Sequence, residues 1–136
     1  MKKVSQGANS NPPILLVLLV MGIVSFFALS YIRELQAKTR DEKRKSDLSQ
    51  IQKELEIYHS THGKYPGVIE KMPSDPVHQL KYSYRSSKDG SKYQLFAKLE
   101  NKKDPEVVLG LDSDCGVACN YGLTSANLEV GGKLDE

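Results

Sequence analysis

The sequence predicts an α+β fold in which a long N-terminal helix, with a membrane half and an amphipathic half, packs on a small antiparallel β-sheet. Three observations predict it. The 136-residue chain has no charged residue between Ser5 and Ile32. The residues that follow, 33–60, contain neither proline nor glycine and are mainly good helix formers. Between residues 80 and 99, apolar and polar side chains alternate on both sides of a turn, which is typical of a β-hairpin.

The first elements are a short polar leader, residues 1–11, and a transmembrane helix, residues 12–33. A helix needs about 20 mostly apolar residues to cross a bilayer, and Pro13 to Ile32 fits that length. A cleaved secretory signal would have a shorter apolar core, and the chain offers only the weak cleavage candidate Ala28-Leu29-Ser30. A buried core helix is disfavoured because the rest of the chain is too small to cover a helix that is apolar on every face. We therefore expect a retained membrane anchor.

Residues 34–61 are the expected amphipathic extension of this helix, and Gly63 and Pro66 are expected to end it. Apolar residues with steps of three, four and three predict a packing face for the globular domain, which comprises Leu48, Ile51, Leu55 and Tyr58. Residues 33–47 look polar on every side, a pattern typical of a helix that bridges through solvent or is covered by other subunits.

An αβ loop punctuated by three prolines is expected at residues 62–79, and a small antiparallel β domain with a C-terminal cysteine loop at residues 80–136. The hairpin in this domain is expected to turn at residues 88–91 and to bury one face. Two further short strands and a loose tail are expected at residues 106–111, 121–124 and 129–136.

The two cysteines, Cys115 and Cys119, are too few for a zinc site, because tetrahedral zinc needs four ligands and no second Cys/His pair is suitably spaced. Their spacing also differs from the C-x-x-C of redox motifs. We expect a small disulfide that closes the loop between them, with two free thiols as the alternative. His59 and His62 lie one helical turn apart, but no third ligand is evident. We expect them to complement the negative end of the helix, and we expect no metal and no cofactor.

The basic run Lys43-Arg44-Lys45 is interrupted in charge by its acidic neighbours Asp41, Glu42 and Asp47. We therefore interpret it as a solvated helix face, or as contacts to lipid headgroups, and not as a nucleic-acid site. A Ser-His-Asp triad, HExxH, a P-loop and GxGxxG are missing from the sequence. We expect no enzymatic activity and no small-molecule substrate.

Residues 39–66, TRDEKRKSDLSQIQKELEIYHSTHGKYP, closely resemble the helix of type II secretion G-type pseudopilins and their type IV pilin relatives. The run Met72-Pro73-Ser74-Asp75-Pro76 resembles the family's Leu-Pro-x-Asp-Pro loop. Residues 115–125, CGVACNYGLTS, are similar to the C-terminal loop of some pilin-like proteins. The resemblance covers nearly the whole chain after Pro12 and implies a pilin-like fold.

The N-terminal region departs from the family pattern. An ungapped alignment places the family's processing-site glycine and following aromatic at Ala8-Asn9, and its membrane glutamate at Pro13. Cleavage by prepilin peptidase therefore stays open. Calcium binds in the corresponding C-terminal loop of G-type pseudopilins, but this sequence has no clear copy of that loop. Calcium therefore also stays open for the acids here, which are Asp104, Glu106, Asp112 and Asp114.

The resemblance implies a structural subunit of a type IV pilus or a type II secretion-type filament, assembled through a helix core at Ile14–Ile32. Its expected partners are membrane lipid, homologous pilin-like subunits and the assembly platform. One alternative is a pilin-like binding module for DNA uptake or adhesion. Another is an uncleaved membrane-anchored protein that does not polymerise.

Two arguments about topology conflict. Six basic residues within about 15 residues of the anchor favour a cytoplasmic C-terminal flank; they are Arg33, Lys38, Arg40, Lys43, Arg44 and Lys45. The resemblance requires the opposite orientation, and the cysteine pair favours an oxidising compartment. We follow the resemblance because its sequence match is longer and more specific. It implies a single-pass protein of the bacterial cytoplasmic membrane, with its C-terminal domain outside the cytoplasm and a place in an extracellular or periplasmic filament.

Overall fold

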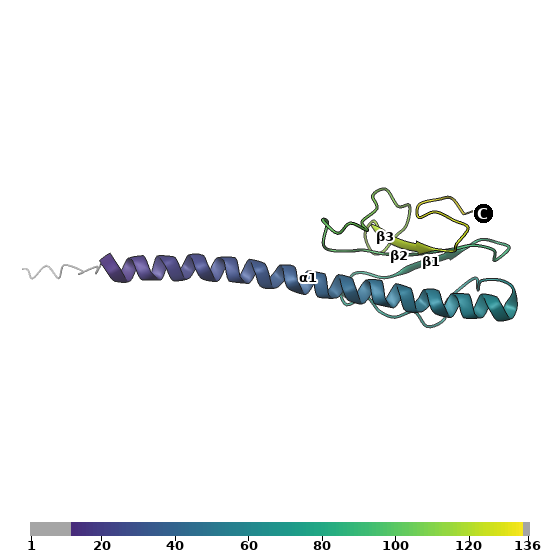
Figure 1. Cartoon of the computed structure of the whole chain (residues 1–136), viewed down its shortest axis with the longest axis horizontal. Helices are drawn as coiled ribbons and strands as arrows, with labels where there is room; N and C mark the ends of the chain where they lie inside the picture. Colours follow the sequence, from purple (N-terminus) through teal and green to yellow (C-terminus); the bar gives the residue numbers. More distant parts are fainter. Residues whose placement is uncertain (1–11, 135–136) are drawn as a thin grey trace, which may run out of the picture. The chain divides into compact units, whose positions relative to one another are not determined.

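The computed structural model describes residues 12–134, which form one α-helix and a three-stranded antiparallel sheet (Figure 1). In chain order the elements are α1 (Pro12–His62), β1 (Ser83–Ser86), β2 (Tyr93–Ala97) and β3 (Tyr121–Thr124). The strand order is β1-β2-β3, so β2 is central and the other two strands are edges. A long N-terminal helix packed on a small antiparallel sheet confirms the predicted α+β class.

Internal contacts divide the chain into a first unit, Met1–Gln36, and a second unit, Ala37–Glu136. Within the described residues, the first unit consists of the N-terminal part of α1. The second unit contains the remainder of α1, the three strands and the loops between them. The hydrophobic core therefore belongs to the second unit.

The end of α1 follows from a single glycine. Gly63 takes a φ of 70°, a left-handed conformation that side-chain-bearing residues rarely adopt. Its amide donates to the carbonyl of His59 at 2.8 Å, which satisfies one of the free carbonyls of the last helical turn. Three residues later Pro66 excludes a return to helix. The chain can therefore turn back toward the sheet directly after His62.

The main core lies between α1 and the sheet. Leu48, Ile51 and Leu55 are at most 3% exposed, and burial of each stabilises the fold by about 1.5–3 kcal/mol. They pack with a set of tyrosines and small or aliphatic residues from the loops and strands, namely Tyr65, Tyr82, Tyr93, Leu95, Ala97, Leu99 and Tyr121. Tyr58, the fourth residue of the predicted packing face, is half-buried outside this cluster and stacks on the His62 ring.

The prediction that the hairpin buries only one face is wrong for β2, in which all five residues are buried. Phe96 points away from α1 into a second apolar cluster with Leu111 and the two cysteines. Gln94 is also buried on β2, and its Nε2 donates to the carbonyl of Gly132 at 2.6 Å. The central strand is therefore covered on both sides, by α1 and by the C-terminal segments.

This packing also corrects the expectation of a loose tail at residues 129–136. Val130 packs against the second cluster, and Gly132 donates its amide to the Glu129 carbonyl at 2.9 Å. The tail is held because β2 has a second apolar face that needs a cover. Residues 135 and 136 lie outside the described residues.

Residues 106–111 were predicted as a strand and form none. Asp104 closes a turn at their start, where its Oδ1 accepts the Glu106 amide and its carbonyl accepts the Val107 amide. Gly110 takes a φ of 78°, which interrupts an extended backbone. Val108 makes a single ladder-like bond, from its amide to the Asn120 carbonyl at 2.8 Å. The apolar residues of this segment therefore pack from a loop.

Candidate functional site

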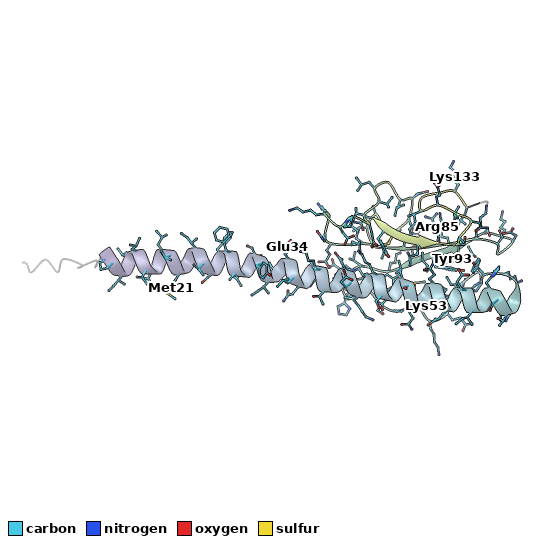
Figure 2. All side chains as sticks on the ribbon, viewed as in Figure 1. Met21, Glu34, Lys53, Arg85, Tyr93 and Lys133 are labelled. Carbon is cyan, nitrogen blue, oxygen red and sulfur yellow. A yellow bond between two sulfur atoms is a disulfide. The ribbon has the colours of Figure 1, made fainter. Side chains whose placement is uncertain are left out.

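The first candidate site is the apolar part of α1 in the first unit. Every side chain from residue 13 to residue 36 is exposed, and the large apolar ones from Ile14 to Ile32 are each 48–68% exposed. Figure 2 shows the side chains around Met21 projecting from all sides of the ribbon. An 18-residue window of this helix has a mean hydropathy of 2.6 and no buried residue. The helix is long and apolar enough to cross a bilayer.

A hydroxyl within this apolar segment is satisfied by the helix itself. Ser30 Oγ donates to the carbonyl of Phe26, four residues earlier, at 3.0 Å. Such back-bonding removes an unsatisfied donor, which would cost several kcal/mol in hydrocarbon. The polar residue is therefore compatible with a lipid environment.

The second candidate site is a buried ion cluster centred on Arg44, which is fully buried. Its Nε and Nη2 donate to the two carboxylate oxygens of Asp75, at 2.7 and 2.8 Å. Its Nη1 donates to Asp41 at 2.7 Å and to Glu100 at 2.8 Å. Burial alone would lower the pKa of Arg44, but these hydrogen bonds more than offset it and hold the pKa above its ordinary value. One guanidinium thus joins α1, the αβ loop and the segment after β2.

Asp41 extends the cluster to the backbone. Its two carboxylate oxygens accept the amides of Glu100 and Asn101, at 2.9 and 2.8 Å. Glu100 in turn accepts two bonds from Arg40, at 2.7 and 2.6 Å. No buried side-chain nitrogen or oxygen among the described residues lacks a partner. The cluster is therefore fully satisfied, the condition under which a buried charge network is tolerated.

A separate polar contact lies one turn further along α1. Asp47 is buried and accepts a hydrogen bond from the Tyr82 hydroxyl at 2.9 Å. It also forms an ion pair with Lys43 at 2.5 Å. Burial and the bond to Asp47 raise the pKa of the Tyr82 hydroxyl, so this tyrosine stays protonated in the working pH range.

These contacts correct the interpretation of Lys43-Arg44-Lys45 as a solvated or lipid-contacting run. Arg44 is buried, and Lys45 bridges Asp104 and Glu106 at 2.9 and 2.6 Å, whereas Lys43 alone of the three is well exposed. The expectation that residues 33–47 bridge through solvent or are covered by other subunits is likewise wrong from Asp41 onward, because one polar face of this segment packs within the chain's own second unit.

Glu100 gives a prediction about acid stability. Hydrogen bonds from Arg40 lower the pKa of Glu100 from 4.5 to about 2. Burial opposes this shift, and the hydrogen bond from Arg44 adds to it. The ionised carboxylate therefore stabilises the fold above pH 4.5, and this contribution is lost as the pH falls through about 2. In denaturant unfolding of the detergent-solubilised chain, Glu100→Gln is expected to lower the free energy of unfolding at pH 7 by on the order of 2 kcal/mol. Near pH 2 the two proteins should converge.

A matched control for this titration is Glu129→Gln, because Glu129 is exposed and has no side-chain partner among the described residues. The free energy of unfolding of the Glu129→Gln variant should equal that of the parent chain across the whole pH range. If the difference in free energy of unfolding between the parent chain and Glu100→Gln stays constant from pH 7 to pH 2, the pH dependence does not come from Glu100.

Three of the four acids considered for calcium form ion pairs instead of a common site, and Asp112 lines a cavity on the sheet. Asp104 and Glu106 hold Lys45, and Asp114 pairs with Lys81 at 2.7 Å and accepts the Gly116 amide. Among residues 12–134, no group of three or more His, Cys, Asp or Glu side chains is placed to hold a metal ion.

The two histidines of the last helical turn contact aromatic rings. The His59 ring stacks on Tyr65 with 4.4 Å between centroids, and the His62 ring stacks on Tyr58 at 4.0 Å. Tyr65 also donates to Glu56, and burial together with this bond raises the pKa of Tyr65 to about 12. The histidines are therefore part of the packing at this end of α1.

The structure joins Cys115 to Cys119 in a disulfide with 5.4 Å between their Cα atoms. The loop they close packs tightly on the chain before β1, where Lys81 donates its amide to the Cys115 carbonyl at 3.0 Å. Gly116 is required there, because it takes a φ of 88° and a Cβ would lie 2.2 Å from the Gln79 carbonyl oxygen. Both cysteines belong to the apolar cluster around Phe96.

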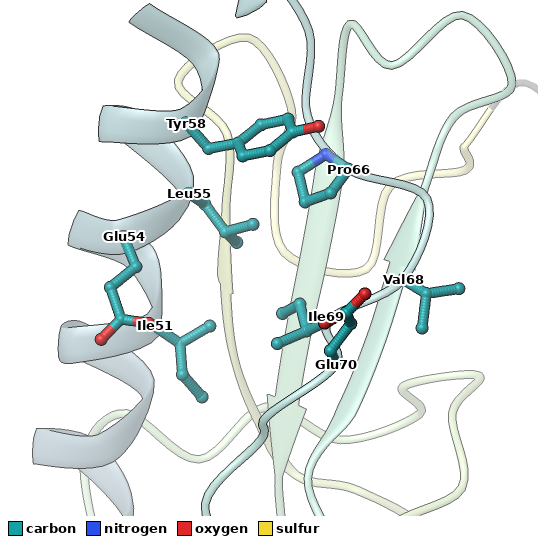
Figure 3. A pocket seen from close by; sticks show the side chains of 8 residues that line it. All are labelled: Ile51, Glu54, Leu55, Tyr58, Pro66, Val68, Ile69 and Glu70. Atoms are coloured by element: carbon teal, nitrogen blue, oxygen red, sulfur yellow. The ribbon is translucent and has the colours of Figure 1, made fainter. Parts of the chain in front are cut away.

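An apolar groove of about 300 Å³ lies between α1 and the αβ loop (Figure 3). Ile51, Leu55 and Tyr58 line its helix side, and the loop supplies Val68 and Ile69. Two acids, Glu54 and Glu70, also line it. Val68 is 76% exposed, so this part of the second unit presents apolar surface to its surroundings.

The Arg44 cluster was missed by sequence reasoning, although a signal for it exists. Asp41 and Arg44 precede Leu48 with the same three-and-four spacing that continues through Ile51 and Leu55. Charged residues that continue an apolar helix stripe are candidates for buried, paired positions, because the same face turns toward the core. The partners, 31 and 56 residues away from Arg44, carry no local mark.

No protein-family model, no curated protein and no solved structure matches this chain.

Proposed function

We propose that this chain is a structural, pilin-like subunit of a type IV pilus or type II secretion-type filament, stored in the membrane and assembled through its helix. The observation that carries the proposal is α1 itself. Its first-unit side chains are exposed and apolar on every side, and the same helix continues into a folded second unit. Such a helix needs lipid before assembly, and after assembly the helices of neighbouring subunits can replace the lipid.

Exposed apolar side chains on the second unit supply further contact points for neighbouring subunits. Val68, Ile57 and Leu109 are 76%, 65% and 86% exposed. Isolated exposed apolar residues are ordinary, but Val68 lies at the groove of Figure 3, beside other apolar residues of α1 and the loop. Together with the resemblance of residues 39–66 to the pseudopilin helix, these surfaces favour a filament subunit over a solitary anchored protein.

The proposed location is the bacterial cytoplasmic membrane, with the second unit outside the cytoplasm. The Cys115–Cys119 disulfide supports this side, because disulfides persist in oxidising compartments and are rare in the cytosol. The partners in this proposal are membrane lipid, homologous pilin-like subunits and an assembly platform.

The experiment is cross-linking in the cell that makes the protein. Val17→Cys adds a free thiol within the exposed apolar segment, while both native cysteines are held in the disulfide. With a short bifunctional thiol reagent, we expect a ladder of covalent species that extends beyond the dimer in the surface-sheared or periplasmic filament fraction. Mass spectrometry of the same fraction identifies the first residue of the assembled chain and so decides whether it is processed.

Lys103→Cys is the matched control, since Lys103 is exposed on a loop of the second unit and should give no comparable ladder. If Val17→Cys stays monomeric in membranes and the filament fraction lacks the chain, the filament proposal fails. That outcome would favour an anchored protein that does not polymerise.

A further inference from the structure

A large cavity of the second unit is on the side of the sheet away from α1. It measures about 670 Å³ and is hereafter called the sheet cavity. Phe96 and Gln94 of β2 line it together with Arg85 of β1, Gly67 of the αβ loop and Lys133 near the C-terminus. Figure 2 labels Arg85 and Lys133 on this side of the sheet. Because Gly67 and β1 both line it, the cavity reaches the open edge of β1.

The charges of the sheet cavity are unbalanced. Arg85 is half-buried with its guanidinium carbon 5.8 Å from the centre of the Phe96 ring. Neither Arg85 nor Lys133 forms an ion pair with a carboxylate among residues 12–134. Asp112 is the one acid among the residues that line the cavity. Arg85 can therefore donate to an added carboxylate without losing a partner within the described residues.

A second cavity, of about 390 Å³, adjoins the first and shares Gly67 and Ser86 with it. Lys64 and Lys88 line this second cavity, and no acid does. Neither lysine has an ion pair with a described carboxylate. The two cavities together present four cations and one acid along the same stretch of β1.

β1 itself has one free edge. It pairs with β2 in register from Ser83↔Phe96 to Ser86↔Tyr93, and the strand order leaves its other side outside the sheet. Within residues 12–134, the backbone of Ser83–Ser86 makes no hydrogen bond to any backbone segment other than β2. All four residues of β1 are half-buried and none is fully buried. An edge of this kind presents outward N–H and C=O groups to another extended chain.

From these observations we propose that an extended acidic peptide segment of a partner protein adds to the sheet beside β1. Its backbone pairs with the free edge, and its carboxylates meet Arg85 and Lys133 in the sheet cavity and Lys64 and Lys88 in the adjoining one. Main-chain bonds supply affinity in such strand addition, and the charged cavities supply selectivity for acidic side chains.

A peptide fits this surface better than a nucleic acid, which the four cations would also attract. Single-stranded nucleic acids need free aromatic faces on which bases stack. The nearby rings are already in use: Phe96 is buried, Tyr84 packs beside Tyr93 and donates to the Pro66 carbonyl, and Tyr58 stacks on His62. The open strand edge, by contrast, presents N–H and C=O groups at the spacing of an extended peptide backbone.

The test uses the full chain in detergent micelles and a fluorescein-labelled synthetic peptide of alternating Glu and Val. Fluorescence anisotropy is expected to show saturable binding that weakens as salt is added. Arg85→Gln with Lys133→Gln should weaken binding by about tenfold or more. Lys102→Gln with Lys103→Gln removes the same charge at exposed loop positions and should leave the affinity unchanged. Thermal unfolding of both variants shows whether the fold is retained.

Two further probes make the result decisive. The same peptide methylated on alternate backbone nitrogens keeps its charge but cannot pair with β1, and its binding should be lost. Asp135→Asn with Glu136→Gln removes the two acids that follow Leu134 in the sequence, and binding should be equal or tighter. The proposal is overturned if the Glu-Val peptide does not bind, if the methylated peptide binds equally well, or if an oligonucleotide of equal charge binds more tightly. The filament experiment above has an independent outcome, since it probes Val17 in the first unit, whereas this site lies in the second unit.

Discussion

Replacing Arg44 with methionine is expected to lower the free energy of unfolding by about 3–5 kcal/mol, a large share of the stability of a small domain. The Arg44 guanidinium donates four hydrogen bonds, and two of its partners, Asp41 and Asp75, are themselves buried. Methionine fills a similar volume but leaves these carboxylates without a counter-charge. Breaking one side of a buried ion pair is costly for that reason.

The measurement is denaturant unfolding of the full chain in detergent, followed by far-UV circular dichroism. Lys53→Met is the matched control, because Lys53 is exposed on the same helix and the change should stay within about 0.5 kcal/mol. Adding Asp75→Asn to Arg44→Met should recover part of the loss, since it removes one orphaned charge. An Arg44→Met chain as stable as Lys53→Met would show that the cluster does not hold the second unit together.

The combined change Met21→Arg and Val24→Arg is expected to abolish stable membrane association. Both residues lie near the middle of the apolar segment and are 61% exposed, so the chain itself does not shield a charge at either position. An arginine at the centre of a membrane helix costs about 2.5–3.5 kcal/mol on insertion scales, and two of them cost about 5–7 kcal/mol. The readout is the fraction of the chain that stays in the membrane pellet after alkaline carbonate washing.

Met21→Leu with Val24→Ile keeps the segment apolar at similar volume, and this control should pellet like the parent chain. The double arginine change leaves the second unit untouched, so its unfolding curve should not move. Equal retention of the arginine variant and the parent in the washed pellet would contradict a membrane-spanning role for α1.

Much of α1 could be predicted because its signals are local. Hydropathy and length mark the apolar segment between Pro13 and Ile32, and the three-and-four spacing of Leu48, Ile51 and Leu55 marks the face that packs. Gly63 and Pro66 mark the end for reasons of backbone conformation that hold in any fold. These features depend on residues within a few positions of each other.

The strands were harder to predict, because an alternation of apolar and polar residues does not show whether one or both faces of the sheet are buried. Tyr93, Leu95 and Ala97 alternate as a half-buried strand should, yet Phe96 and Gln94 between them are buried too. Their cover comes from segments beyond residue 108, which pack there because Phe96 offers them an apolar surface. The same loop conformation that brings Leu111 onto Phe96 prevents residues 106–111 from forming a strand.

The sequence by itself determined that a charge-free apolar helix long enough to cross a bilayer precedes a small sheet-containing unit, because hydropathy and periodicity are properties of neighbouring residues. The tertiary structure alone decided that Arg44 is buried, that β2 is covered on both faces, and that four cations converge beside the free edge of β1. A charged side chain is solvated unless distant segments bring it counter-charges, and the carboxylates of Asp75 and Glu100 reach Arg44 only when the chain has folded.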